Sequence, residues 1–246
     1  MQLVQAGEIG LGDLITDYLP DYPMQGHEVT IRHLLTHTSG IKSYTSMESW
    51  RPKMRLDLTD EELVAIFGPE PFDFAPGERY LYNNSGYYLL GVIIGEASGE
   101  PYQEYLNAHL FGTLDLVGSS YCDERPIIPG RAEGYELVGG ELLNDEPLSM
   151  NQPGAAGALC STVVDLLFWT RALRAGRVVS AASYEQMTTP SGHWGSRFRT
   201  CWMSQSPRRR SPPTRVFTSS LRASSCPSSG GTAASGPRRQ GRAPFG

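Results

Sequence analysis

The sequence predicts a mixed α/β (α+β) fold that is mostly helical, in a body running from Met1 to Pro190. Apolar residues recur at helical spacing in several segments, most densely between Ser85 and Ala97. The residues around Gly139-Gly140 have the pattern of a β-hairpin that turns on two glycines. A body of this length can build one domain with a hydrophobic core of its own.

Helices are expected in several segments along this body, and cap residues mark some of their ends. Thr59 and Glu62 form a capping box at the start of one helix. Thr162 is a good N-cap for another, with Asp165 placed to reach back to it. The expected helices are Gln2–Ala6, Leu11–Tyr18, Ile31–Thr36, Asp60–Phe67, Ser85–Ala97, Tyr102–Leu110, Val163–Arg174 and Ala181–Thr188, and the hairpin pairs Gly134–Val138 with Glu141–Leu143.

A polar cluster, Tyr82-Asn83-Asn84, directly precedes the most apolar helix. A turn at Pro76-Gly77 comes before it, because proline fixes φ and glycine is free to take positive φ. A phenol and a carboxamide at the start of a buried helix are held rigidly, and each can donate and accept hydrogen bonds. Two interpretations stay open on these residues alone. Tyr82 and Asn84 carry chemistry, or Asn84 is an N-cap and Tyr82 is a core tyrosine.

Three phrases carry a resemblance to a known family: LLTHTSGI (34–41), FAPGERYLYNNSGYYLLG (74–91) and GALCSTVVDLLFW (157–169). In content and order they resemble the serine β-lactamase and penicillin-binding-protein-like family of bacteria. That family includes class C β-lactamases, D-alanyl-D-alanine carboxypeptidases and related esterases. The resemblance implies a helical domain packed against an antiparallel sheet. Because the two ends of the chain build that sheet in the family, this chain is expected to be incomplete at both ends.

The resemblance also implies acyl transfer through a covalent serine, whose S-x-x-K motif supplies the nucleophile and a lysine. The family's Y-x-N motif matches Tyr82-Asn83-Asn84. Tyr82 would then pass protons between nucleophile and leaving group, and Asn84 would hydrogen-bond the lysine and the substrate's amide. The implied substrate of the intact parent is a small-molecule amide or ester, such as a β-lactam, a D-alanyl peptide or a simple ester. No metal or other cofactor is expected.

The nucleophile is not evident in the chain. The one S-x-x-K sequence, Ser39-Gly40-Ile41-Lys42, follows a helix that ends at a glycine, whereas the family's serine and lysine face each other on a long helix. Comparing Leu3–Tyr18 with the family puts the motif just before Met1. The chain as written is therefore expected to be inactive. The alternative is a non-catalytic binding protein for cell-wall peptide or a protein partner.

Residues 191–246 differ in composition from the body. They contain ten arginines and no lysine, aspartate or glutamate, whereas the body has eleven basic and 26 acidic residues. This Arg/Ser/Pro-rich tail is expected to be disordered or translated out of frame. A basic tail for nucleic acid or membranes and a flexible linker are the other interpretations. His193-Trp194-Gly195 matches the family's H-x-G motif, but without an alternating strand around it the match is interpreted as chance.

The acidic balance of the body argues against nucleic-acid binding by the folded part. No apolar run is long enough for a membrane-spanning helix, and the cellular compartment stays open. Two of the four cysteines, Cys122 and Cys160, lie in the body, and Cys201 and Cys226 lie in the tail. A disulfide between Cys122 and Cys160 is one option, although nothing in the sequence supports it.

Overall fold

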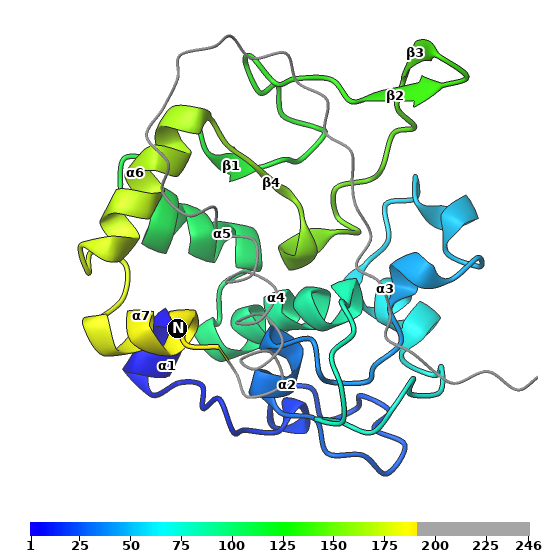
Figure 1. Ribbon diagram of the computed structural model, residues 1–246, viewed down its shortest axis with the longest axis vertical. Helices are drawn as coiled ribbons and strands as arrows, with labels where there is room; N and C mark the ends of the chain where they lie inside the picture. Colours follow the sequence, from blue (N-terminus) through cyan, green and yellow to red (C-terminus); the bar gives the residue numbers. More distant parts are fainter. Residues whose placement is uncertain (191–246) are drawn as a thin grey trace, which may run out of the picture. The chain divides into compact units, whose positions relative to one another are not determined.

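The structure is a computed structural model that describes residues 1–190 (Figure 1). The predicted tail and the His193-Trp194-Gly195 match lie outside these described residues. The helices are α1 (Gln2–Ala6), α2 (Ile31–Leu35), α3 (Asp60–Phe67), α4 (Asn84–Ser98), α5 (Tyr102–Leu106), α6 (Val163–Arg174) and α7 (Ala181–Thr188). The 3₁₀ turns are η1 (Ile15–Asp17), η2 (Tyr44–Ser46), η3 (Arg51–Lys53) and η5 (Gly154–Ala156), and η4 (Asn107–Phe111) is a π-helical turn. The strands are β1 (Ser120–Tyr121), β2 (Tyr135–Val138), β3 (Glu141–Asn144) and β4 (Leu159–Cys160).

Helix α4 runs through the hydrophobic core and carries the candidate site at its first turn. It packs against α1, α2, α5 and η5. Gly91 lets η5 approach closely, because a Cβ at this position would lie 2.7 Å from the Cβ of Ala155. Burial of this apolar helix is what holds the polar residues at its start in place. The most deeply buried core residues are Ile15, Val29, Leu34, Ile41, Tyr44, Leu63, Phe67, Leu89 and Ile93.

Four helices, α1, α3, α6 and α7, have the predicted bounds, and local caps explain two of them. Thr59 Oγ1 accepts from the Glu62 N–H at 3.3 Å while Glu62 Oε2 accepts from the Thr59 N–H at 2.9 Å, which is the predicted capping box. Thr162 Oγ1 accepts from the Asp165 N–H at 3.1 Å. The Asp165 carboxylate does not reach back to Thr162 as expected. It accepts from the N–H of Gly118 instead, at 2.8 Å.

The helix predicted over Leu11–Tyr18 is wrong. Leu14 pairs with Thr30 in an isolated antiparallel bridge, and only the short turn η1 follows. The carboxylate of Asp17 accepts a hydrogen bond from the Leu14 N–H at 3.0 Å. Such local bonds from a side chain to the backbone compete with helix formation. The apolar spacing of Leu11–Tyr18 therefore predicted a helix that does not form.

One further helix prediction needs adjustment, one pair of strands was missed, and the hairpin prediction holds. The helix expected over Tyr102–Leu110 is α-helical only to Leu106 and then widens into η4. The short strands β1 and β4 were not predicted, because two residues cannot display an alternating pattern. The hairpin β2–β3 is confirmed, with Gly139 at φ 61° and Gly140 at φ 93°. Within residues 1–190 the strands therefore form two separate antiparallel pairs, β1–β4 and β2–β3.

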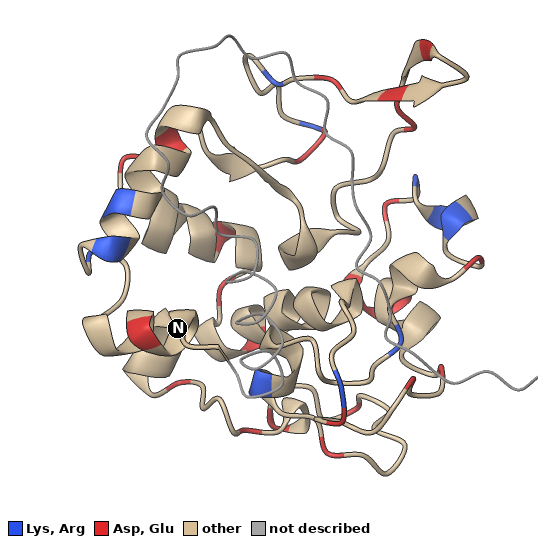
Figure 2. Ribbon diagram, in the orientation of Figure 1, with Lys and Arg blue, Asp and Glu red and all other residues tan. Residues whose placement is uncertain are grey.

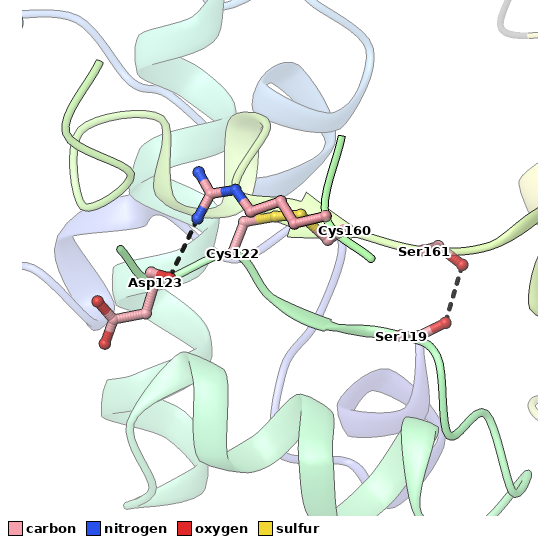
Figure 3. The surroundings of a disulfide bond; sticks show 6 residues. Ser119, Cys122, Asp123, Cys160 and Ser161 are labelled. Carbon is pink, nitrogen blue, oxygen red and sulfur yellow. Dashed lines mark hydrogen bonds between the residues drawn. A yellow bond between two sulfur atoms is a disulfide. The ribbon is translucent and has the colours of Figure 1, made fainter. Parts of the chain in front are cut away.

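A disulfide links Cys122 to Cys160 beside the β1–β4 pair (Figure 3). Its Cα atoms are 5.3 Å apart, and the Cys122 N–H donates to the carbonyl of Ala158 at 2.8 Å. At the other end of the pair, the hydroxyls of Ser119 and Ser161 are hydrogen-bonded at 2.8 Å. These contacts join the loop before α6 to the chain that follows α5.

Figure 2 shows the acidic residues spread over helices and loops along the described chain, with few basic residues among them. All 26 acidic residues of the protein fall within residues 1–190. The longest apolar helix, α4, has 15 residues, and none of the helices in this part of the chain meets the length and hydropathy needed to cross a bilayer.

Candidate active site

Asn83, rather than Asn84, caps helix α4. Its Oδ1 accepts from the Gly86 N–H at 2.9 Å, and its Nδ2 donates to the carbonyl of Ile41. The side chain is almost wholly buried, with 4% exposed. The interpretation of Asn84 as the N-cap is therefore wrong, and the carboxamide of Asn84 is left for other contacts.

Asn84 is the first residue of α4 and is half-buried. Its Nδ2 donates to Thr45 Oγ1 at 2.9 Å, and its backbone N–H donates to Ser43 Oγ at 3.2 Å. The segment 41–45 thus runs alongside the start of the helix. A carboxamide fixed in this way on a first helical turn can present its acceptor oxygen and its second N–H hydrogen to a bound molecule.

Tyr82 is not a core tyrosine, because 57% of it is exposed. Its ring packs against the imidazole of His37, with centroids 4.7 Å apart. Its hydroxyl makes no hydrogen bond to another residue in the described range. The phenol is therefore held by its ring and is open at its polar end, which is the condition for exchanging a proton with an incoming group.

The Ser39–Lys42 sequence does not form a nucleophile pair. Ser39 is 1% exposed, and its Oγ accepts from the N–H of Ile41 at 3.3 Å. Lys42 Nζ is ion-paired with Asp73 Oδ1 at 2.7 Å. Gly40 between them has φ +75°, so the segment is a turn rather than a helix. The hydroxyl is thus inaccessible, and the ammonium is engaged elsewhere.

His37 is the site residue that sequence reasoning missed. Its Nδ1 accepts from the Asn83 N–H at 3.1 Å, and its ring stacks on Tyr87 at 4.8 Å between centroids. Burial lowers the pKa of this imidazole below its ordinary value, which favours the neutral form. The one feature of the sequence that marks His37 is its place in LLTHTSGI, directly after the end of a helix. Its contact with Asn83 joins residues that are far apart in the sequence, so no local pattern reveals it.

A cavity of about 1280 Å³ borders this cluster. His37, Tyr80 and Tyr87 line one part of it, and Trp169 of α6 and Met187 of α7 line another. Tyr82 and Asn84 are not among its lining residues. Across the described range, no three His, Cys, Asp or Glu side chains come together in a way that could hold a metal ion.

Comparisons with known proteins agree on one family. The family model described as Beta-lactamase matches residues 1–224, which runs past the boundary expected at Pro190. A penicillin-binding protein of Bacillus subtilis is 37% identical over 76% of this chain. Among solved structures, a D-stereospecific amidohydrolase from a Streptomyces species is 28% identical, with a TM-score of 0.69, and covers 77% of this chain. A penicillin-binding protein from Bacillus halodurans is 29% identical over the same share, with a TM-score of 0.67.

These matches cover only part of the relatives. The chain spans about half the length of the curated relatives it matches, 46% and 44% of two of them. It spans 61% of the Streptomyces chain and 58% of the Bacillus halodurans chain. The neighbours support the predicted α+β class, in which a helical domain belongs to a larger helix-and-sheet fold. The boundary at Pro190 stays a prediction.

Proposed function

This chain belongs to the Beta-lactamase family of serine hydrolases, and we propose that Tyr82 and Asn84 are its proton-transfer and hydrogen-bonding residues. The observation that carries the proposal is the division of roles within Tyr82-Asn83-Asn84. Asn83 caps the helix and leaves the exposed phenol of Tyr82 and the carboxamide of Asn84 available. Asn84 is fixed on the first turn of α4, and Tyr82 is held beside it by the His37 ring, as acid–base chemistry requires.

The reaction we propose for the intact parent is hydrolysis of an amide or ester through an acyl-serine. The serine oxygen attacks the substrate carbonyl, and its proton leaves through the Tyr82 phenol to the departing amine or alcohol. Asn84, with its Oδ1 and one Nδ2 hydrogen still unused, hydrogen-bonds the lysine and the amide of the substrate. Water then attacks the carbonyl carbon of the acyl-serine, the bond to the serine oxygen breaks, that oxygen takes a proton from the water, and the acid is released. The substrates are a β-lactam, a D-alanyl peptide or a simple ester, and the amidohydrolase neighbour favours an amide.

We propose further that the chain as given does not turn over substrate. Its one S-x-x-K sequence holds a buried serine, and the lysine is ion-paired with Asp73. A lysine engaged in this way cannot take a proton from Ser39, and the serine offers no accessible attacking atom. In this proposal, the nucleophilic serine and its lysine are encoded upstream of Met1.

Labelling with a fluorescent penicillin, alongside a chromogenic cephalosporin and a p-nitrophenyl ester, tests this proposal. We expect no covalent label and no hydrolysis above background, since only a competent serine forms the acyl adduct. Ser39→Ala is the matched control and should behave like the parent chain. Stoichiometric labelling lost in Ser39→Ala would overturn the proposal.

The alternative function is non-catalytic binding of cell-wall peptide or a protein partner. The cavity lined by His37, Tyr87 and Trp169 is the observation that favours it. Calorimetry with a D-alanyl-D-alanine peptide separates the two. Saturable binding without acylation supports this alternative. If the peptide does not bind, the chain is not a binding protein for cell-wall peptide.

A further inference from the structure

The imidazole of His37 packs against three tyrosine rings, and those of Tyr82 and Tyr87 are nearer than that of Tyr80. The centroid of His37 is 4.7 Å from that of Tyr82 and 4.8 Å from that of Tyr87, and the planes of His37 and Tyr87 differ by only 22°. Tyr87 is itself anchored, because its hydroxyl donates to the carbonyl of Leu35 at 3.1 Å. The stack therefore ties Tyr82 to the end of α2 and to the first turn of α4.

His37 also holds the backbone on both sides of Tyr82. Its carbonyl accepts from the Leu81 N–H at 2.9 Å, and its Nδ1 accepts from the Asn83 N–H at 3.1 Å. An acceptor at Nδ1 requires the neutral imidazole with its proton on Nε2. One residue thus contacts three consecutive positions, of which the middle one is the proposed proton carrier.

The backbone of His37 has φ +56°, in the left-handed region that residues other than glycine rarely occupy. Such a conformation persists only where surrounding contacts hold it. Here it lets the carbonyl and the ring of the same residue reach the segment 81–83. A histidine that only filled space would need neither this conformation nor an acceptor at Nδ1.

We propose that His37 is a positioning residue that orients the Tyr82 phenol, through the ring contact and through the bond to the Asn83 N–H. The inference rests on the proposed role of Tyr82. His37 itself does not touch the reacting atoms. The Tyr82 hydroxyl makes no hydrogen bond within the described residues, so the ring and its two flanking amides are what fix its direction.

Two readouts on the 246-residue chain test this inference at low micromolar concentration. Hydrogen exchange at single-residue resolution reports the amides of Leu81 and Asn83. The ¹⁹F signal of 3-fluorotyrosine-labelled protein, assigned by its loss in Tyr82→Phe, reports the Tyr82 ring. In His37→Ala we expect exchange at Asn83 to speed up about fivefold or more. We expect the Tyr82 signal to move to the position of a solvent-exposed tyrosine.

His37→Asn separates the two contacts. Asparagine tolerates positive φ, and its amide oxygen can replace the acceptor, but it offers no aromatic ring. We expect slow exchange at Asn83 to be restored and the Tyr82 signal to stay shifted. His109→Ala is the matched control. It removes another histidine packed on a tyrosine, Tyr105 at 4.4 Å between centroids, and should change neither readout.

An unchanged Tyr82 signal and unchanged Asn83 exchange in folded His37→Ala would overturn the inference. Equal loss of protection throughout α2 and α4 in both variants would also overturn it, because that is the effect of a general structural residue. If His37→Ala does not fold, His37→Asn alone tests the inference. An unchanged Tyr82 signal in His37→Asn would then contradict it. None of these readouts depends on acyl transfer. A negative result here can therefore be told apart from covalent labelling at Ser39, the result that would overturn the proposed function.

Discussion

The Oδ1 of Asn83 accepts a hydrogen bond from the Gly86 N–H at 2.9 Å, so this asparagine caps the start of helix α4. The same side chain donates from Nδ2 to the carbonyl of Ile41, which joins the helix to the chain that follows α2. The middle residue of Tyr82-Asn83-Asn84 therefore has the structural role. Its neighbours Tyr82 and Asn84 do not cap the helix, and they are the residues we propose for the chemistry.

Replacing the two asparagines by alanine should separate these roles. We expect Asn83→Ala to lower the free energy of unfolding by about 2–4 kcal/mol, because it removes an N-cap and leaves a buried carbonyl without its donor. Asn84→Ala should cost less than about 1 kcal/mol, since Asn84 makes one side-chain bond at a partly exposed position. Urea unfolding followed by far-UV circular dichroism measures both. Equal losses would contradict this division.

The sequence could predict those parts of the fold that local signals determine. Helices α3 and α6 are capped by Thr59 and Thr162, which are three residues from the N–H groups that they bind. Two adjacent asparagines, in contrast, leave the choice of cap undecided. The deciding contact, from Asn83 to Ile41, spans 42 residues. The role of His37 was missed for the same reason, since its partner Asn83 is 46 residues away.

The disulfide between Cys122 and Cys160 should contribute measurably to stability. It closes a loop with a sequence separation of 38. By loop-closure entropy, its loss should lower the free energy of unfolding by about 3–4 kcal/mol. Peptide mapping without reductant should find the Cys122–Cys160 pair, and the double variant Cys122→Ala, Cys160→Ala should unfold at lower urea concentration. Recovery of both peptides as free thiols from oxidised protein would contradict the prediction.

Stability should fall as the pH is lowered below about 6.5, the ordinary pKa of histidine. Burial lowers the pKa of both His33 and His37. The unfolded chain therefore takes up protons first, and stability present above pH 6.5 is lost as the pH falls through the lowered pKa values. For His37, protonation also turns Nδ1 from an acceptor into a donor opposite the Asn83 N–H.

Thermal melts between pH 8 and pH 5 check this dependence. The groups packed on His37 are the phenols of Tyr80, Tyr82 and Tyr87, and Arg32 and Glu185 border the same cavity. His37→Asn should flatten the slope between pH 6.5 and pH 5, because it removes one of the two titrating groups. An identical slope in the parent chain and in His37→Asn would show that His37 does not titrate in this range.

Helix α6 should drive self-association. Val164, Leu167 and Phe168 lie on one face of α6 and are 54%, 49% and 45% exposed, whereas Asp165 is buried. Apolar side chains in a row on a surface favour association. We expect oligomers at tens of micromolar in light scattering, and the double variant Val164→Lys, Phe168→Lys should shift the chain toward monomer. Ile127→Lys adds charge at an exposed loop residue and should not. A monomeric parent chain with a sharp cooperative melt would contradict this expectation.

The role of Tyr82 can be measured in the protein that an extended reading frame would encode. Sequencing about a hundred codons before Met1 should reveal an in-frame S-x-x-K. In that extended protein Tyr82→Phe should lower the rate of acylation by about 10²–10⁴-fold, since phenylalanine keeps the ring but cannot carry a proton. Tyr105→Phe removes a remote phenol and should leave the rate unchanged. Acylation that survives Tyr82→Phe would reassign the proton transfer to another group, and stop codons before Met1 would leave this chain without its nucleophile.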